Sequence, residues 1–161
     1  MAADRSDYAP HQWHDNLILG LSLDLGDIEA GDWRSTLALD IDHIVSWSCA
    51  LDGVGAFHVA PATLQFFHAT DLRIAVDCGD SGGQTSIHEW SIDCITRRPI
   101  ENQKICFDRP YYAWRIELNW PRGGLIGFAA SDFALTLRAE PLALAQPKLP
   151  AAYRRHGAGA Q

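Results

Sequence analysis

Apolar residues recur at every second position along most of the chain, and this period of two is typical of β-strands with one buried face. Between residues 17 and 25, five leucines occupy the odd positions. The same alternation runs through residues 33–42 and 64–76, with a bend or bulge expected near Thr70-Asp71. It returns in residues 87–95, where it points His88, Trp90, Ile92 and Cys94 inward, and in residues 112–120. These segments predict antiparallel strands joined by turns rich in Gly and Asp.

The segment after the turn at residues 121–124 allows two interpretations. Apolar residues at 126, 128, 133, 135 and 137 indicate one long strand or two short ones that end before Pro141. Ser131 or Asp132 could instead cap a short helix over residues 131–139. We favour strands. The fold class predicted is all-β, an antiparallel β-sandwich or barrel of about six to eight strands, with one short helix as the alternative.

Strand parity also predicts which side chains are buried. A slip of one residue would exchange the two faces of a strand, so the inward and outward sets are mutually exclusive. The inward set comprises Trp33, Phe66, Trp90, Trp114 and Leu118. The outward set, facing solvent or a partner, comprises Arg34, Gln65, Arg115 and Glu117.

The chain has 161 residues, of which 47% are hydrophobic and 20% are charged. This length and composition predict one globular domain with a single core. We place the domain at residues 13–144. Residues 1–12 and 145–161 are predicted to be flexible ends with little to pack against.

The net charge is −7, with 13 basic and 20 acidic side chains. Such a chain is repelled by nucleic acids and by anionic membrane surfaces, so neither is an expected partner. The doublets Arg97-Arg98 and Arg154-Arg155 are interpreted as solvated surface charge. The start of the chain lacks the features of a signal peptide and no segment is long and apolar enough to span a bilayer, which predicts a cytoplasmic protein. The cysteines, Cys49, Cys78, Cys94 and Cys106, are then expected to be free thiols.

Gly79-Asp80-Ser81-Gly82-Gly83 resembles the nucleophile motif of chymotrypsin-like serine proteases. The resemblance implies Ser81 as a nucleophile activated by a histidine such as His88. However, the segment around that family's catalytic histidine is absent, and Gln84 stands where the family has proline. Because the motif lies between two predicted strands and glycine accepts positive φ, we interpret it as a hairpin loop.

Three histidines, His43, His68 and His88, share strand parity with neighbouring core residues. Inward histidines from three strands could bind a metal, but the ligand spacing of a cupin is absent, and hydrogen-bonded core histidines are the simpler interpretation. His11-Gln-Trp-His14-Asp15 is superficially similar to the His-Asp pair of metal-dependent phosphohydrolases. We interpret it as a capped start of the sheet with Trp13 packed on the core. No cofactor is predicted.

Acidic residues gather at and near the first hairpin, and they could bind a cation or a basic partner. They lack the arrangement of a calcium loop around a turn-forming glycine. A solvated acidic edge that keeps other strands from pairing is the alternative interpretation. Asp24 belongs to this acidic set, and the residues predicted to bind a partner are Asp27, Glu29, Asp32, Asp40 and Asp42.

Three stretches, Trp13-His14-Asp15, Ala60-Pro61-Ala62-Thr63-Leu64 and Trp120-Pro121, resemble uncharacterised bacterial all-β proteins of unknown function over residues 13–141. The resemblance implies a bacterial β domain and transfers no catalytic residue. We therefore predict a non-catalytic acidic scaffold that binds a protein partner or a ligand. The alternatives are a hydrolase using Ser81, a metalloenzyme using the inward histidines, and a structural subunit of a homo-oligomer.

Overall fold

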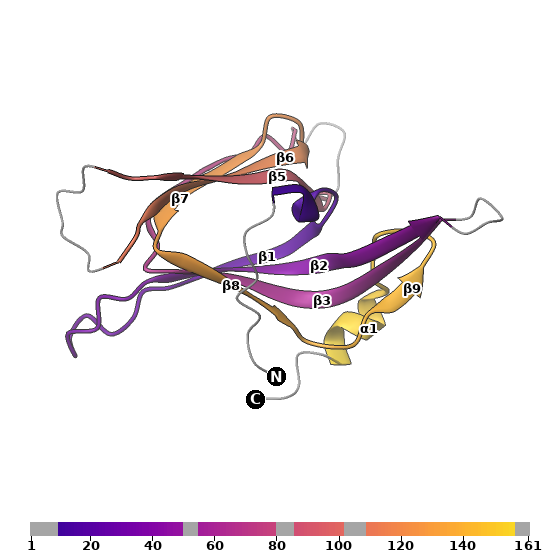
Figure 1. Cartoon of the computed structure of the whole chain (residues 1–161), viewed down its shortest axis with the longest axis horizontal. Helices are drawn as coiled ribbons and strands as arrows, with labels where there is room; N and C mark the ends of the chain where they lie inside the picture. Colours follow the sequence, from indigo (N-terminus) through magenta and orange to yellow (C-terminus); the bar gives the residue numbers. More distant parts are fainter. Residues whose placement is uncertain (1–9, 50–54, 80–85, 102–108, 157–161) are drawn as a thin grey trace.

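The computed structural model describes residues 10–49, 55–79, 86–101 and 109–156. Within these ranges nine strands belong to one antiparallel sheet, with the order β4-β7-β6-β5-β1-β2-β3-β8 and with β9 paired to β3 (Figure 1). The all-β prediction is confirmed, with more strands than expected. The strands are β1 (Leu17–Asp24), β2 (Thr36–Cys49), β3 (Gly55–Phe67), β4 (Thr70–Ala75), β5 (Trp90–Pro99), β6 (Tyr112–Trp120), β7 (Leu125–Ala130), β8 (Asp132–Leu137) and β9 (Leu142–Leu144).

The sheet bends over itself, so that β5, β6 and β7 face β1, β2, β3 and β8 across the interior (Figure 1). It is not closed, and β4 and β8 are its two ends. On one side β1 joins the two layers. It pairs with β2 along its whole length, but in the described residues it meets β5 only at Leu17 opposite Ser91 and Ile18 opposite Trp90.

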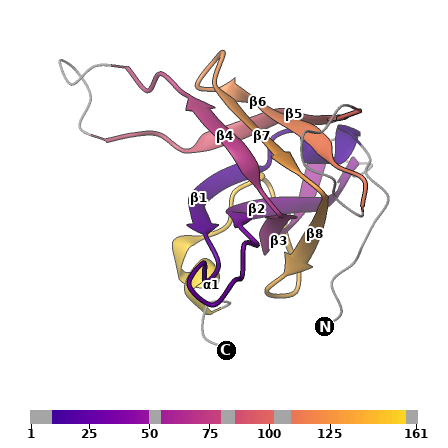
Figure 2. The same ribbon diagram turned by 90° about the vertical axis from the view of Figure 1, so that its left-hand side faces the viewer.

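The chain crosses between the layers at two corners. At the first, His68 and Ala69 follow β3 and turn the chain into β4, which lies alongside β7 (Figure 2). His68 has φ 55° and Asp71 has φ 56°. Both values lie in the left-handed region, which residues other than glycine rarely adopt. The prediction of one strand over residues 64–76 is therefore wrong, although the expected irregularity near Thr70 is present as a register shift.

The second corner is Ser131, between β7 and β8. Its N–H donates to the Phe67 carbonyl oxygen at 3.0 Å, which ties the two corners together. Residues 132–137 beyond it are a strand that pairs with β3 from Ala62 to Phe67. The helix considered for residues 131–139 is not formed, because these residues complete a sheet edge instead.

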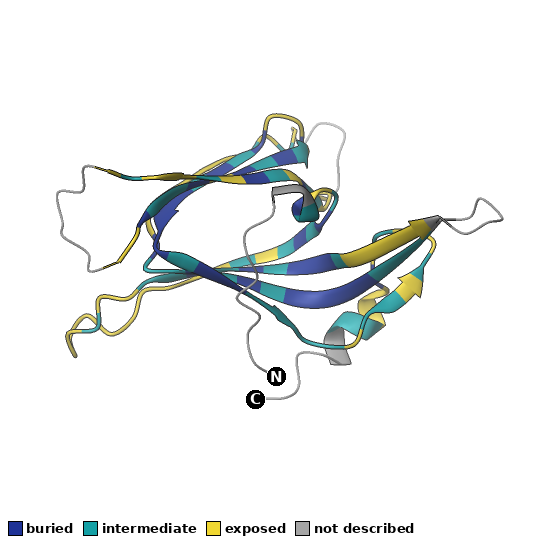
Figure 3. Ribbon diagram, viewed as in Figure 1, coloured by how far each residue is buried: buried dark blue, intermediate teal, exposed yellow. Residues whose placement is uncertain are grey.

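Aromatic side chains fill the space between the layers. The Phe66 ring lies 5.0 Å from Trp114 and 4.6 Å from Phe128, and Trp114 lies 5.5 Å from Phe133, between ring centroids. All four side chains are buried. Buried stretches of ribbon, drawn dark blue, occur in both layers (Figure 3). The Trp114 indole N–H also donates to the Ala130 carbonyl oxygen. The predicted burial of Phe66 and Trp114 is confirmed.

The other predicted core residues give mixed results. Leu118 is buried and Trp90 is half-buried against the core, but Trp33 is 73% exposed. Trp33 lies in the loop before β2, and strand parity does not apply outside a strand. Of the residues predicted to face outward, Arg34 and Arg115 are exposed, whereas Gln65 and Glu117 are half-buried.

Strand β5 departs from simple alternation. Its pairing with β6 shifts register between Ile92 and Cys94, and both Ile92 and Ile95 are buried. Such a bulge adds a residue on one strand and changes the parity of the residues after it. The prediction that Cys94 and His88 point inward is wrong: Cys94 is half-buried and His88 is exposed before β5 begins.

The described part of the C-terminal segment packs against the sheet. β9 pairs with β3, and α1 (Ala151–His156) follows it. Leu149 is only 2% exposed, and its N–H donates to Asp42 Oδ2 at 2.9 Å. The expectation that this tail has little to pack against is wrong. None of the helices in the described ranges has the length and apolar character to cross a bilayer.

An ion pair anchors α1 to the outer face of β2. Asp42 is fully buried, and Arg154 donates to its two carboxylate oxygens at 3.0 and 2.5 Å. Arg154 is therefore not the solvated surface charge expected from its sequence context. A buried carboxylate without its partner is strongly unfavourable, so α1 is part of the folded unit.

Truncating Trp114 should be far more destabilising than truncating its neighbour. We expect Trp114→Ala to lower the free energy of unfolding by about 3–5 kcal/mol, because it leaves a cavity among packed rings. Arg115 pairs with Glu117 at an exposed site, so Arg115→Ala should cost less than about 1 kcal/mol. Urea unfolding monitored by circular dichroism measures both. A larger loss for Arg115→Ala would mean that the register of β6 is inverted.

Removing Arg154 should show that the tail is structural. We expect Arg154→Ala to lower the free energy of unfolding by about 3–5 kcal/mol, because Asp42 stays buried without its partner. The control is Arg34→Ala, whose pair with Asp32 is exposed and screened by solvent, so its loss should be much smaller. Equal, small losses for the two variants in thermal unfolding would contradict the buried pair.

Candidate functional site

A hollow of about 500 Å³ opens at the two corners where the chain changes layer. Its walls come from the end of β3, from β5, from the start of β6 and from the β7–β8 corner. Two guanidinium groups, an imidazole, a hydroxyl and aromatic rings converge there from segments far apart in the sequence. The lining residues are Phe67, His68, Arg97, Arg109, Pro110, Tyr112, Ser131 and Asp132.

The strained backbone of His68 is held in place by Tyr111. The Tyr111 hydroxyl donates to the His68 carbonyl oxygen at 2.5 Å and lies 2.9 Å from Thr70 Oγ1. Burial raises the pKa of the Tyr111 phenol, so the hydroxyl keeps the proton that it donates. Backbone strain in proteins concentrates at functional sites, and here it aims the His68 side chain into the hollow.

The hydrogen bonds of His68 fix where its proton lies. Arg109 Nη1 is 3.3 Å from His68 Nε2, and a guanidinium can only donate, so Nε2 accepts. The imidazole proton is then on Nδ1, which donates to Ser131 Oγ at 2.7 Å. Ser131 directs its own proton to the Phe67 carbonyl oxygen at 3.3 Å. His68 is thus a donor to Ser131 and does not act as its base in this arrangement.

Arg97 extends the cationic wall along β5. Its guanidinium carbon lies 4.5 Å from the centroid of the Tyr112 ring and 5.4 Å from that of Trp114. Stacking on aromatic faces stabilises a guanidinium and fixes the plane of its N–H donors. Among the described lining residues the one carboxylate is that of Asp132, whose Oδ1 accepts the Phe133 N–H at 2.8 Å. The described lining is therefore cationic overall.

The structure does not bring His43, His68 and His88 together. His43 lies on β2 and is buried against Trp13 of η1 (Pro10–Trp13). Its Nδ1 is 3.2 Å from Asn16 Oδ1. His68 lies at the corner described above and His88 is exposed. Among the residues that the structure describes, none of the three shares a cluster of metal-binding atoms with the others. The hypothesis of a metalloenzyme built on these histidines is therefore dropped, because bulges and corners change the parity on which it rested.

The acidic residues near the first hairpin have separate roles. Asp42 is buried against Arg154, and Asp40 pairs with Arg138. A hydrogen bond from Arg34 lowers the pKa of Asp32 to about 2. Asp42 is thus wrongly predicted as partner-binding, since its carboxylate holds the tail. Asp27 and Glu29 are exposed, and partner binding by them stays a prediction.

Ser81 lies outside the described residues, so the structure does not place it. The described residues beside it line a hollow of about 340 Å³, which includes Cys78, Gly79 and His88. Gly79 has φ 84°, a conformation suited to glycine in a turn.

The start of the sheet follows the sequence-based interpretation. Trp13 is 1% exposed and packs 5.8 Å from the His43 ring. His14 and Asp15 are about half exposed and pair with each other, with His14 Nδ1 2.9 Å from Asp15 Oδ2. Asn119 Nδ2 also donates to Asp15 at 2.7 Å.

The sequence analysis missed most of the residues around the hollow at the two corners, which we call the corner pocket. It treated Arg97 as solvated charge and did not single out Arg109, Tyr111 or Ser131 for function. One local signal was present: the run Arg109-Pro110-Tyr111-Tyr112 places a cation beside two aromatic residues. The pairing of this run with His68 and Ser131 depends on tertiary contacts and has no sequence signature.

Comparison with protein families, with curated proteins and with solved structures finds no match for this chain. The fold and the side-chain geometry therefore carry the functional argument alone.

His43 should make the protein less stable in mild acid. Burial lowers the pKa of His43 from 6.5 to about 4. Between these values the unfolded chain binds a proton that the folded chain does not, so stability falls as pH drops from 6.5 to 4, by up to about 3 kcal/mol. His43→Gln should flatten this part of the pH profile in denaturant unfolding. An unchanged slope in the variant would show that His43 is not the group responsible.

Proposed function

We propose that this protein is a non-catalytic ligand-binding module whose corner pocket takes a small molecule with an oxyanion group and a planar or aromatic part. The observation that carries the proposal is the convergence of Arg97, Arg109 and His68 on one hollow of about 500 Å³. Ligand pockets are typically hollows of this size with a few convergent polar groups.

The positive charge of the described lining supports an anionic ligand. The chain carries net charge −7, yet this hollow has two guanidinium groups and one carboxylate in its described lining. A cationic wall in an acidic protein attracts anions locally while the remaining surface repels them. Each guanidinium offers five N–H donors in a planar fork that matches carboxylate and phosphate oxygens, and it can do so alongside its protein contacts.

The rings beside the guanidinium groups support a planar ligand part. Phe67 and Tyr112 line the hollow, and Arg97 stacks over Tyr112. Aromatic faces and guanidinium planes stack favourably on other planar groups. An aryl phosphate or aryl carboxylate combines both features that the walls offer.

The proton arrangement supports binding over catalysis. A serine nucleophile needs a base that accepts its proton, whereas His68 Nδ1 donates to Ser131 and Nε2 accepts from Arg109. The same donor set orients a bound anion without activating a nucleophile. The hydrolase alternative therefore gains no support from this histidine and serine.

Phenyl phosphate titrated into the protein by isothermal calorimetry tests the proposal. We expect saturable binding that weakens roughly tenfold or more in Arg97→Gln, because a charge-assisted hydrogen bond contributes about 1.5–3 kcal/mol. Arg109→Gln should weaken binding similarly. The matched control is Arg98→Gln, since Arg98 is the next residue on β5, is exposed and does not line the hollow.

Two outcomes would count against the pocket. One is equal affinity in Arg97→Gln and Arg98→Gln, which would place the anion elsewhere. The other is the absence of measurable binding of phenyl phosphate, inorganic phosphate and benzoate at millimolar concentrations.

A further inference from the structure

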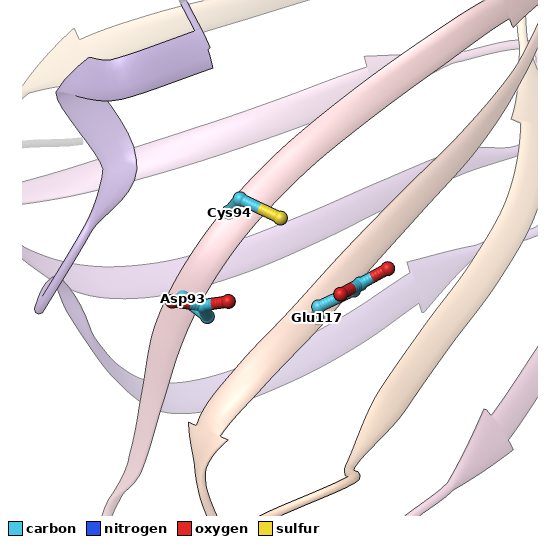
Figure 4. Close-up of side chains that lie close together, drawn as sticks. All are labelled: Asp93, Cys94 and Glu117. Carbon is cyan, nitrogen blue, oxygen red and sulfur yellow. The ribbon is translucent and has the colours of Figure 1, made fainter.

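Three side chains with metal-binding atoms meet on the outer face of β5 and β6, away from the corner pocket, and a histidine lies beside one of them. Ligand atoms of Asp93, Cys94 and Glu117 all lie within 4.8 Å of one another (Figure 4). His14, in the turn after η1, brings its Nε2 to 3.5 Å from Asp93 Oδ1. The set offers one sulfur, one nitrogen and two carboxylate groups.

The register shift in β5 explains how adjacent residues share one face. Neighbours on a regular strand point to opposite faces, but Asp93 and Cys94 both lie between the buried Ile92 and Ile95. Cys94 pairs with Glu117 across the strands. The bulge therefore turns Asp93 and Cys94 out together, beside the carboxylate of β6.

The imidazole of His14 has the orientation of a metal ligand. Its Nδ1 contacts Asp15 Oδ2 at 2.9 Å, and Asp15 in turn accepts from Asn119 at 2.7 Å. Metal-binding histidines commonly donate their second N–H to a carboxylate in this way, which fixes the tautomer and the ring. His14 Nε2, on the other side of the ring, lies 3.5 Å from Asp93 Oδ1. A cation placed there would contact both atoms.

We propose that His14, Asp93, Cys94 and Glu117 form a surface site for a divalent cation of the zinc class. Zinc takes tetrahedral sets of sulfur, nitrogen and oxygen at about 2.0–2.3 Å. Such ligands lie roughly 3–4 Å from one another, so metal binding requires rotamer changes that draw the four side chains together. Magnesium and calcium prefer all-oxygen sites with more ligands, and the thiol argues against them.

The carboxylates beside the thiol favour a cation there. A cation bound by Cys94 takes the place of the thiol proton, and the Asp93 and Glu117 carboxylates within 4.8 Å attract it. Arg115 Nε contacts Glu117 Oε1 at 2.6 Å. This exposed pair competes with the metal for one oxygen of Glu117.

Cobalt(II) is the probe, because a cobalt-bound thiolate gives a charge-transfer absorption in the near ultraviolet. The full chain, reduced and without a histidine tag, is titrated with Co²⁺ and then with Zn²⁺. We expect this absorption to saturate at about one Co²⁺ per chain, given one four-ligand site, and to disappear when Zn²⁺ is added. Cys94→Ser should abolish it, whereas the control Cys78→Ser, which alters the other described free thiol, should retain it.

Asp15→Asn tests the positioning role of Asp15. It should weaken Co²⁺ binding roughly 10- to 100-fold while keeping the charge-transfer absorption, as loss of an outer carboxylate does. Near-ultraviolet circular dichroism checks that each variant is folded, and Glu117→Gln serves in place of Cys94→Ser if that variant unfolds. Absorption that is absent in the parent chain, or that survives Cys94→Ser or Glu117→Gln unchanged, would overturn the site. The result is independent of the phenyl phosphate titration, since the two sites share no residue.

Discussion

The two corners at which the chain passes between layers determine where the sheet loses its regular hydrogen bonds and where the corner pocket lies. At each corner the sheet loses its regular hydrogen bonds, and buried backbone groups must find other partners. Ser131 satisfies the Phe67 carbonyl through its N–H, and the Tyr111 hydroxyl satisfies the His68 carbonyl. The positive φ of His68 persists because these contacts hold it. The pocket follows from this arrangement, since His68 and Ser131, the residues at the two corners, also line the hollow.

The bulge in β5 links the core to both candidate sites. Before it Ile92 faces the interior, and after it Ile95 does. With strict alternation from Ile92, Cys94 would point inward and Arg97 would point outward. The extra residue instead leaves Cys94 outside and directs Arg97 toward the Tyr112 and Trp114 rings. One irregularity thus separates a cationic pocket from an acidic thiol cluster three residues earlier on the same strand.

The limits of prediction from sequence follow from the same features. Alternation correctly located β1, β6 and the burial of Phe66, because those signals are local. The leucine face that it predicted for β1 is not buried, since Leu23 and Leu25 are exposed whereas Ile18 is buried. It failed for Cys94, where a bulge changes parity, and for Trp33, which lies outside a strand. The partner of Asp42 is Arg154, 112 residues away, so neither residue alone indicates a buried pair. The corner pocket was missed for the same reason: His68, Arg97 and Ser131 meet only through the folding of the sheet.

The two proposed sites would select ligands of opposite charge by different physical means. In the corner pocket, guanidinium and imidazole N–H donors beside aromatic faces would meet an anion in a partly enclosed hollow. At the β5 bulge, carboxylates and a thiol whose ligand atoms lie within 4.8 Å of one another would meet a cation. Net charge does not distinguish these cases, because the value of −7 is a sum over the whole chain and does not describe either site. Local donor geometry does, and it is set by the corner in one site and by the bulge in the other.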